Sequence, residues 1–399
     1  MQKITKKESG FTLVELMVAI SLGFILTFAV IQTFFATRQT ARANDGVARI
    51  QENARFSLQF MTEDVRNAGY SGCVGRVRNK LFGNDPSEFL SFVNPLFGWE
   101  ANGTGPGNGG EGFELTNNIG GGADWTGSAS IGGTELPPYL SNGLLIEGSD
   151  VIGISTFRRV NAAISESDNS DGTINTVGPH NVDVNGLVLV GDCWESELFQ
   201  NSTGGDVLTA AEESGTPGNR DLPVENVWLR PYASNDVLFE LGYKFYFIGE
   251  GANGSPSLFS FETKQPLSSL DDADVAAGSL ELVEGIESMQ ILYGEDVDGP
   301  EGDGTGIDGN PNRYVSANDV TDWANVVSAR VGLLLRSPNN ATDIDQANSY
   351  VLLDDITISD GENDAILRYS VNSTVKLRNK ALQPVLATFV CNAGTEGCR

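Results

Sequence analysis

An uninterrupted apolar stretch near the N-terminus constrains this chain more than any other feature. No charged residue occurs between Leu16 and Thr37, and no proline interrupts the wider segment from Phe11 to Phe35. About 20 apolar residues are enough to cross a bilayer as a helix, so the segment is long enough to span a membrane. Glu15 lies near its start, where an ionised carboxylate is costly unless it is paired or close to the membrane interface. The sequence therefore predicts a transmembrane helix whose one acidic residue needs a partner.

A basic leader, residues 1–10, precedes the apolar stretch. A secretory signal is cleaved on the C-terminal side of its apolar region. Here the small residue Gly10 lies on the N-terminal side of the apolar stretch, so cleavage at Gly10 would leave the span attached to the mature protein. The order of a lysine-rich leader, Gly10, Phe11 and then Glu15 resembles the class III signal of type IV prepilins and type II secretion pseudopilins. The alternative is an ordinary signal anchor in which Glu15 occurs by chance.

The resemblance to prepilins implies both a processing step and an assembly contact. A prepilin peptidase would cut between Gly10 and Phe11 and methylate the new amine of Phe11. Glu15 would then pair with the terminal amine of a neighbouring subunit, which supplies the partner that its position requires. These roles of Gly10, Phe11 and Glu15 are what the resemblance implies.

The charge distribution indicates the topology. Residues 1–10 carry three lysines and one glutamate, so the net charge of −28 becomes −30 after their removal. Such an acidic chain repels phosphate, and we expect no nucleic-acid partner. Because the lysines precede the span, the positive-inside rule places the leader in the cytoplasm and the rest of the chain outside. We expect a single-pass protein of the inner membrane with a periplasmic C-terminal domain.

The chain continues as helix beyond the span. No proline occurs before residue 67, and apolar residues recur at spacings of three and four from Val47 to Val65, which indicates an amphipathic helix. The predicted helix runs from Phe11 to Asn67, about 85 Å at about 1.5 Å per residue. We assign residues 11–37 to a transmembrane and assembly half and residues 38–69 to a periplasmic half.

Strand signals dominate the remainder of the chain. Residues 83–143 are rich in glycine, which is typical of a surface loop, with a binding loop as the alternative. The predicted fold class is α+β, a long N-terminal helix packed on a mainly antiparallel β-sheet domain, residues 70–399, with residues 83–143 as an insertion. Segments rich in β-branched and aromatic residues predict strands at 144–146, 151–157, 187–190, 237–248, 258–262, 280–293, 326–335 and 367–377.

The C-terminal half carries a second resemblance. Segments 283–294 (VEGIESMQILYG), 312–315 (NRYV) and 326–337 (VVSARVGLLLRS), together with 64–70 (DVRNAGY), are similar to the minor pilin family PilW. The resemblance implies a structural role, in which the subunit joins other minor pilins in a complex that primes pilus assembly and lies near the pilus tip. It also implies the major pilin as a partner through the N-terminal helix, and a large tip adhesin.

Two other functions remain as alternatives. A type II secretion pseudopilin of the J type shares the signal and the plan of one helix on a β domain. A tip-exposed adhesin or ligand-binding module, which belongs to a different class, would use the long loops as a binding surface.

Four cysteines favour disulfides in an exported chain. Cys391 and Cys398 lie seven residues apart near the C-terminus, so we predict that they close a short loop. Cys73 and Cys193 would then form the second pair, although four cysteines allow three pairings. A thiolate metal site is disfavoured because Cys73 and Cys193 each lack a neighbouring cysteine.

An acidic loop is the one candidate ion site. Its carboxylates offer the hard oxygen ligands that Ca²⁺ prefers, but their spacing departs from the EF-hand pattern. The alternative is an acidic connection between strands, and we expect no other cofactor. The candidate calcium ligands are Asp296, Asp298, Asp303 and Asp308, with Glu301 beside them.

No catalytic motif is evident. The single histidine, His180, lies in a predicted loop, where we expect it to face solvent, and the sequence has no GxSxG element. We therefore expect no enzymatic activity.

Overall fold

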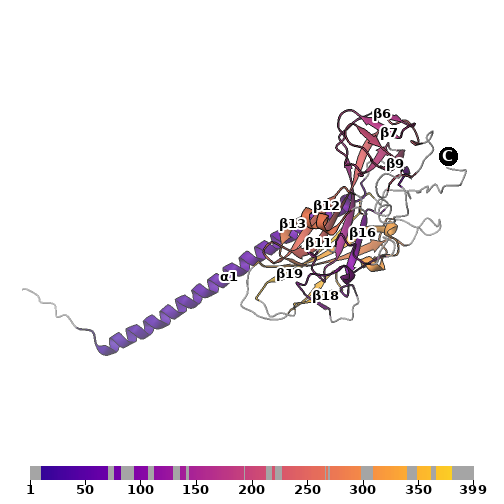
Figure 1. The fold of residues 1–399 in the computed structure, drawn as a ribbon. Helices are drawn as coiled ribbons and strands as arrows, with labels where there is room; N and C mark the ends of the chain where they lie inside the picture. Colours follow the sequence, from indigo (N-terminus) through magenta and orange to yellow (C-terminus); the bar gives the residue numbers. More distant parts are fainter. Residues whose placement is uncertain are drawn as a thin grey trace, which may run out of the picture.

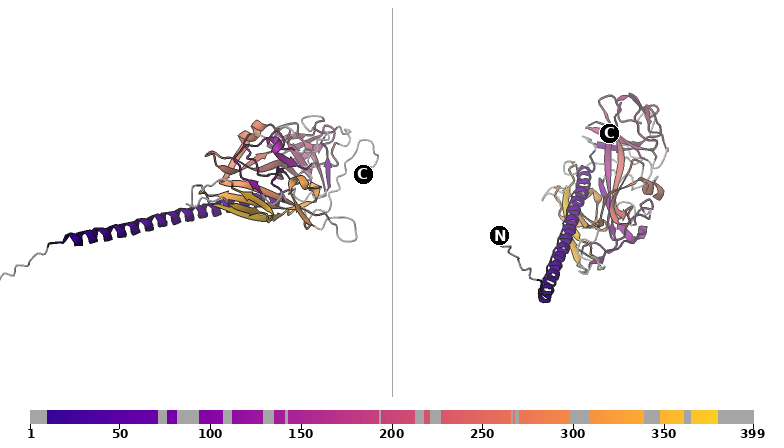
Figure 2. Two further views of the ribbon diagram at one scale, coloured as in Figure 1. Left: turned by 90° about the horizontal axis from the view of Figure 1, so that it is seen from below. Right: turned by 90° about the vertical axis from the view of Figure 1, so that its left-hand side faces the viewer.

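One long helix extends from a β-rich domain (Figure 1). This helix, α1, runs from Leu13 to Asn67. Its first half projects away from the domain and its second half lies against it, as two further views show (Figure 2). In the computed structural model the described residues are 10–70, 76–81, 94–106, 112–128, 135–140, 143–192, 194–212, 218–220, 227–265, 267, 270–297, 309–338, 348–360 and 365–379.

Local sequence explains where α1 begins and ends. Thr12 is extended and caps the first turn, as side-chain oxygens at this position commonly do. Gly69 follows the helix with φ of +68°, and a Cβ there would lie 2.7 Å from the Pro95 ring. Because that conformation and that close approach both favour glycine, the helix stops where the sequence predicted.

The largest sheet has nine strands among the described residues. Its order is β1-β9-β8-β11-β5-β2-β4, with β12 paired to β11 and β13 paired to β12. The β1–β9 pair is parallel and the other pairs of this sheet are antiparallel. The strands are β1 (Arg76–Asn79), β2 (Leu96–Ala101), β4 (Trp125–Gly127), β5 (Val151–Arg159), β8 (Leu187–Gly191), β9 (Glu195–Gln200), β11 (Val237–Glu250), β12 (Pro256–Thr263) and β13 (Ser279–Glu284).

A second sheet of four antiparallel strands follows along the chain. Its order is β15 (Arg313–Val315), β14 (Ile286–Glu295), β16 (Val326–Arg336) and β19 (Arg368–Lys376). Gly285, with φ of +81°, separates β13 in the first sheet from β14 in the second. The chain therefore changes sheets at this glycine.

Two small sheets are also present in the part of the chain that the structure describes. One joins β10 (Val207–Thr209), β7 (Thr173–Thr176) and β6 (Ile164–Asp168) over a separate apolar cluster. The other joins β17 (Ser349–Leu352), β18 (Ile356–Ser359) and β3 (Phe113–Glu114). In the described residues the short helices are α3 (Asp272–Gly278) and the 3₁₀ turns η1 (Gly122–Asp124), η5 (Ala317–Asp319) and η6 (Trp323–Asn325).

The second half of α1 is part of the main core. Its buried positions recur every three or four residues, and the apolar ones join the cluster formed by the two large sheets. At the end of the helix, Asp64 accepts a hydrogen bond from the Tyr246 hydroxyl and lies 2.8 Å from the Lys244 ammonium. The buried positions of α1 are Gly46, Ile50, Ala54, Ser57, Met61 and Val65.

The predicted fold class is confirmed, and several predicted strands match observed ones closely. The predicted segments at 151–157, 187–190, 237–248, 258–262, 326–335 and 367–377 correspond to β5, β8, β11, β12, β16 and β19. The segment at 144–146 contributes only isolated bridges. The single strand predicted at 280–293 is wrong, because Gly285 divides it into β13 and β14.

The interpretation of residues 83–143 as a surface loop is also wrong for β2 and β4, which belong to the largest sheet. Every residue of β2 is buried, and β2 pairs with β5 inside the largest sheet. Trp125, in β4, is 1% exposed. Because the region is rich in glycine, its sequence does not predict the strand LFGWEA, whose apolar side chains belong to the core.

Candidate functional site

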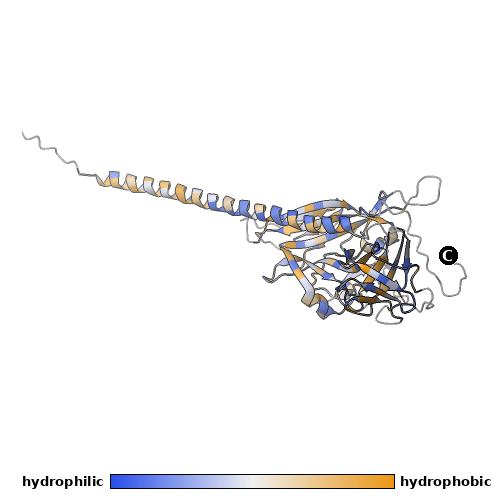
Figure 3. Cartoon of the chain, turned by 90° about the horizontal axis from the view of Figure 1, so that it is seen from above, coloured by the Kyte–Doolittle hydropathy of each residue, from blue (hydrophilic) through white to orange (hydrophobic). Residues whose placement is uncertain are grey.

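The first half of α1 is an exposed apolar surface. Every residue from Gly10 to Arg42 is exposed, including the rings of Phe24, Phe28 and Phe35. From Leu13 to Phe35 the helix rises about 35 Å at about 1.5 Å per residue, and the hydrocarbon layer of a bilayer is about 30 Å thick. By length and composition this helix can cross a membrane. Figure 3 shows the apolar colouring along this projecting half and the mixed colouring where α1 meets the domain.

Most polar side chains of this half are satisfied within the helix itself. Five hydroxyls donate hydrogen bonds of 2.8–2.9 Å to the carbonyl oxygen four residues earlier. Hydroxyls bound in this way need no water, so the surface suits lipid or the face of another helix. The five are Ser21, Thr27, Thr33, Thr37 and Thr40.

Glu15 completes the start of α1. Its Oε2 atom accepts hydrogen bonds from the Thr12 amide at 2.9 Å and the Thr12 hydroxyl at 3.0 Å, while its own amide donates to the Thr12 hydroxyl at 3.3 Å. This reciprocal arrangement is a capping box. The carboxylate stays exposed at the helix end, near Phe11, a residue that is 87% exposed. Cleavage after Gly10 and the pairing of Glu15 with a neighbour stay predictions.

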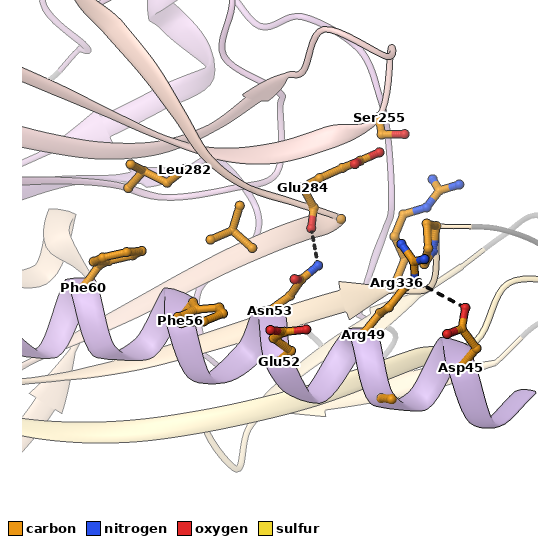
Figure 4. A pocket seen from close by; sticks show the side chains of 14 residues that line it. Asp45, Arg49, Glu52, Asn53, Phe56, Phe60, Ser255, Leu282, Glu284 and Arg336 are labelled. Carbon is orange, nitrogen blue, oxygen red and sulfur yellow. Dashed lines mark hydrogen bonds and ion pairs between the residues drawn. The ribbon is translucent and has the colours of Figure 1, made fainter.

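A groove follows α1 where the helix meets the domain (Figure 4). One wall is a face of α1 that includes Arg49, Phe56 and Phe60, and the other is formed by the end of β13 with Leu282 and by Arg336. Its volume is about 700 Å³. The Asn53 amide donates to the Glu284 carbonyl oxygen at 2.9 Å and so connects the two walls.

Two buried carboxyl groups meet between the large sheets. Glu100 in β2 is 3% exposed and Asp150, directly before β5, is 2% exposed. The Asp150 oxygens accept hydrogen bonds from the Ala101 amide at 2.9 Å and the Ile291 amide at 2.7 Å, so this side chain connects β2 to β14. The Thr104 hydroxyl donates to Glu100 at 3.1 Å. Neither carboxyl forms an ion pair within the described part of the chain.

Burial determines how this acidic pair ionises. It raises the pKa of Glu100 well above the ordinary value, and the nearby charge of Asp150 acts in the same direction. Burial also raises the pKa of Asp150, although the two backbone amides oppose that rise. Because those amides favour a charged Asp150, we assign the proton to Glu100. The protonated Glu100 carboxyl can donate a hydrogen bond to the Asp150 carboxylate, whereas two ionised carboxylates would repel each other. The pair is closed to solvent and therefore lies away from any surface that a substrate could contact.

A second buried charge lies at the parallel edge of the largest sheet. The Lys80 ammonium is 3.4 Å from a Glu197 oxygen and 3.3 Å from the centre of the Trp228 ring. Burial lowers the pKa of Lys80 to about 7. Glu197 also accepts hydrogen bonds from Arg78 at 3.0 Å and from the Tyr232 hydroxyl at 2.7 Å. The cluster connects β1 and β9 to the segment that contains Trp228.

The acidic loop is described only at its ends. Asp296 is buried and accepts a hydrogen bond of 2.6 Å from the Gly309 amide, which joins the two ends. Asp298, Asp303 and Asp308 lie outside the described residues, so calcium binding stays a prediction. In the described ranges no group of three or more His, Cys, Asp or Glu side chains is placed to hold a metal ion.

The remaining predictions concern the histidine and the cysteines. His180 does not face solvent, because it is 3% exposed and its Nδ1 accepts a hydrogen bond from the Val182 amide at 3.0 Å. The expectation for this histidine is therefore wrong, because its buried ring is bound to the backbone of its own loop. The disulfide pairings stay predictions, because all four cysteines lie outside the described residues: Cys73, Cys193, Cys391 and Cys398.

Comparison with known families gives two matches. The model described as "Type IV Pilus-assembly protein W" (PilW) matches residues 245–379, which run from the second half of β11 through β19. The model described as "Prokaryotic N-terminal methylation motif" matches residues 5–31, which include Gly10, Phe11 and Glu15. Both resemblances seen in the sequence are thereby confirmed. Searches of curated proteins and of solved structures found no significant match.

The acidic pair gives a testable pH dependence. A carboxyl group whose pKa is raised by folding contributes stability that is complete below its unfolded pKa, about 4.3 for glutamate, and is lost as the pH rises through the folded value. We expect Glu100→Gln, which keeps the neutral form, to become more stable relative to the parent as the pH rises from 5 to 9. The difference grows by at most about 1.4 kcal/mol per pH unit.

Chemical denaturation of the full chain in detergent, followed by tryptophan fluorescence, measures this difference. The lowered pKa of Lys80 makes the stability of the folded protein rise with pH above about 7. Because Lys80 is present in both chains, this contribution cancels when Glu100→Gln is compared with the parent. Glu114→Gln, at an exposed position, is the control and should follow the parent. Parallel pH curves for Glu100→Gln and the parent would show that Glu100 is already ionised in the folded protein.

Proposed function

We propose that this chain, a type IV pilus-related pilin with a PilW domain and an N-terminal methylation motif, is a minor pilin that initiates pilus assembly. In this role it joins other minor pilins in a priming complex in the inner membrane and afterwards lies near the pilus tip. The observation that carries the proposal is the exposed apolar half of α1, residues 13–42, which continues without a break into the core of the domain.

The physical chemistry of that half supports assembly through helices. Its apolar side chains are as well accommodated by lipid as by other apolar helices, so association within the membrane depends on close side-chain packing and on polar contacts rather than on the hydrophobic effect. Glu15 is different, because an ionised carboxylate within a membrane is costly without a partner. A neighbouring subunit with a free N-terminal amine offers that partner, so Glu15 favours the bundle over the lone subunit.

The shape of the domain supports a position near the end of a filament. The lobe that contains β6 and β7 lies at the far side of the domain from the projecting helix (Figure 1). It has its own apolar cluster, separate from the core that holds α1. Such a lobe adds bulk that every repeat of a filament would have to accommodate, whereas a subunit at the tip has free space above it.

The proposal assigns partners and location. The other minor pilins and the major pilin contact the projecting half of α1, the prepilin peptidase acts on the leader, and a large tip adhesin contacts the domain. The domain itself is periplasmic until the pilus emerges. The role is structural, and twitching motility and adhesion are the processes that it serves.

Processing at the leader is the first test of this function. Mass spectrometry of protein extracted from membranes should find Phe11 as the N-terminal residue, with one methyl group on its amine. Gly10→Val, which places a branched side chain at the cleavage junction, should retain the leader. An intact Met1 terminus on the parent chain, in cells whose peptidase processes other prepilins, would contradict the proposal.

Glu15 gives the second test. Glu15→Val should still insert in the membrane, because the change removes a costly polar group, but less of it should be recovered with other minor pilins after detergent extraction. Thr12→Val is the control, since it removes the hydroxyl that caps the helix and leaves the carboxylate in place. Equal recovery of Glu15→Val and the parent would mean that Glu15 has no role in assembly.

The identity of the recovered partners separates the proposal from its nearest alternative. Other minor pilins and the major pilin support a type IV pilus. Components of a type II secretion channel would instead identify the chain as a pseudopilin.

A further inference from the structure

We propose that an exposed tryptophan, Trp194, forms part of a binding surface for neutral glycans at the end of the domain opposite the projecting half of α1. This inference goes beyond the proposed function, because it assigns a ligand to the domain rather than an assembly contact. The surface consists of Trp194 and two side chains beside it, Asp192 and Arg230, which together fix the turn between β8 and β9.

Trp194 differs in its exposure from every other tryptophan of the chain. It is 80% exposed, and water is an unfavourable environment for so large an apolar side chain. Aromatic side chains contribute strongly to binding when a partner covers them. Trp194 therefore offers a flat apolar surface to a ligand. The other four tryptophans are each at most 3% exposed: Trp99, Trp125, Trp228 and Trp323.

A hydrogen bond and ion pairs hold the backbone that carries Trp194. One oxygen of Asp192 accepts a hydrogen bond from the Trp194 amide at 2.8 Å, and the other lies 2.9 Å from the Arg230 guanidinium. Arg230 also pairs with Asp236 and lies over the Tyr232 ring, 4.7 Å from its centre. The Asp192 and Arg230 side chains are still 36% and 29% exposed, so both can contact a ligand. The surface is thus formed in advance, which lowers the cost of ordering it on binding.

The register of β11 places this turn far from the projecting half of α1. Tyr246 in β11 bonds to Asp64 near the end of α1, whereas Val237, where β11 begins, pairs with Gly191 at the end of β8. The strand between Val237 and Tyr246 is about 30 Å long at about 3.3 Å per residue. Figure 1 shows β9, which follows the turn, on the side of the domain opposite the projecting helix. Trp194 is therefore remote from the surface that suits lipid.

The apolar area at this turn is small. Trp194 and Leu229, which is 50% exposed and precedes Arg230, together expose on the order of 300 Å². A stable protein interface covers about 800 Å² on each partner. The side chains beside Trp194 are charged, namely Asp192, Glu195 and Arg230. Such a patch suits a ligand that covers one aromatic ring and forms hydrogen bonds with the charged groups around it.

A sugar ring has the chemistry that this patch requires. One face of a pyranose carries C–H groups that pack on an indole ring. Its edge carries hydroxyls, which can donate to a carboxylate such as Asp192 and accept from a guanidinium such as Arg230.

The charge of the chain selects among ligands that stack on aromatic rings. Nucleic acids also stack in this way, but a chain with a net charge of −28 repels their phosphates. The same repulsion disfavours acidic sugars. Glycans without charge are therefore the ligands that these observations favour.

Saturation-transfer NMR and calorimetry on the purified full chain test the proposal. The ligands are cellohexaose, maltohexaose and chitohexaose, which are neutral and differ in linkage, in a detergent whose head group is not a sugar. We expect at least one of them to receive saturation from the protein. We expect Trp194→Ala to bind that sugar at least about tenfold more weakly, because it removes the stacking surface. Trp194→Phe, which keeps an aromatic ring, should retain part of the affinity.

Tyr369→Ala is the matched control. Tyr369 is 54% exposed and lies on β19, in a different sheet, so this variant loses an exposed aromatic ring elsewhere and should bind like the parent. Because Trp194 is exposed, Trp194→Ala should also keep the melting temperature of the parent. A loss of sugar binding in Trp194→Ala would then not come from unfolding.

Three results would overturn the proposal. They are the absence of binding of all the neutral sugars to the parent, equal affinities of Trp194→Ala and the parent, and binding of hexagalacturonate, an acidic sugar, as tight as that of the neutral ones. If no sugar binds and Trp194→Ala instead lowers the recovery of other pilus proteins, the patch is a protein contact. The sugar-binding assays use the chain alone, so their failure leaves the proposed minor-pilin function untouched.

Discussion

The packing of the second half of α1 against both large sheets is the interaction on which the rest of the structure depends. Its buried stripe, from Gly46 to Val65, lies in the core, and Asp64 at its end contacts Lys244 and Tyr246 of the central strand β11. Because α1 is one continuous helix, fixing this half also sets the direction of the half that projects. The core thus holds an apolar helix of membrane-spanning length at a defined orientation to the domain. The groove arises from the same packing, since α1 forms one of its walls.

The projecting half has a physical requirement that the isolated chain does not meet. Its apolar residues are exposed from Phe11 to Phe35, and water is an unfavourable environment for so large an apolar surface. Its hydroxyls are bound within the helix, and Glu15 is the one charged residue between Phe11 and Thr37. Lipid is a favourable environment for the apolar side chains, but the Glu15 carboxylate also needs a cationic partner. These two requirements together favour a subunit that begins in the membrane and then moves into an assembly.

The sequence predicts the parts of this structure that depend on local patterns. The span of α1 follows from its periodicity and from the absence of proline, and the predicted end at Asn67 agrees with the structure.

Other features depend on contacts between distant segments. The change of sheet at Gly285 appears in the sequence only as one glycine within a segment that predicts a single strand, and β2 lies in a glycine-rich region although most of its own residues are apolar. Glu100 and Asp150 lie fifty residues apart, and Phe56 and Arg336 are further apart still, so neither the acidic pair nor the groove can be predicted from spacing. A lone glutamate within an apolar segment, as at Glu100, was the one available signal of a buried carboxyl.

An exchange of the membrane span tests the central claim most directly, because it separates anchoring from assembly. Residues 16–35 are replaced by an unrelated apolar transmembrane helix of equal length, while the leader, residues 11–15 and the whole domain are kept. The amount of this chain recovered with other minor pilins is then compared with that of the parent, at matched abundance in the membrane. The account predicts that the exchanged chain is processed and anchored but recovered with minor pilins at a clearly lower level, because a foreign helix does not reproduce the face that packs in the bundle. Recovery equal to that of the parent would show that the span serves only as an anchor, and would contradict the account.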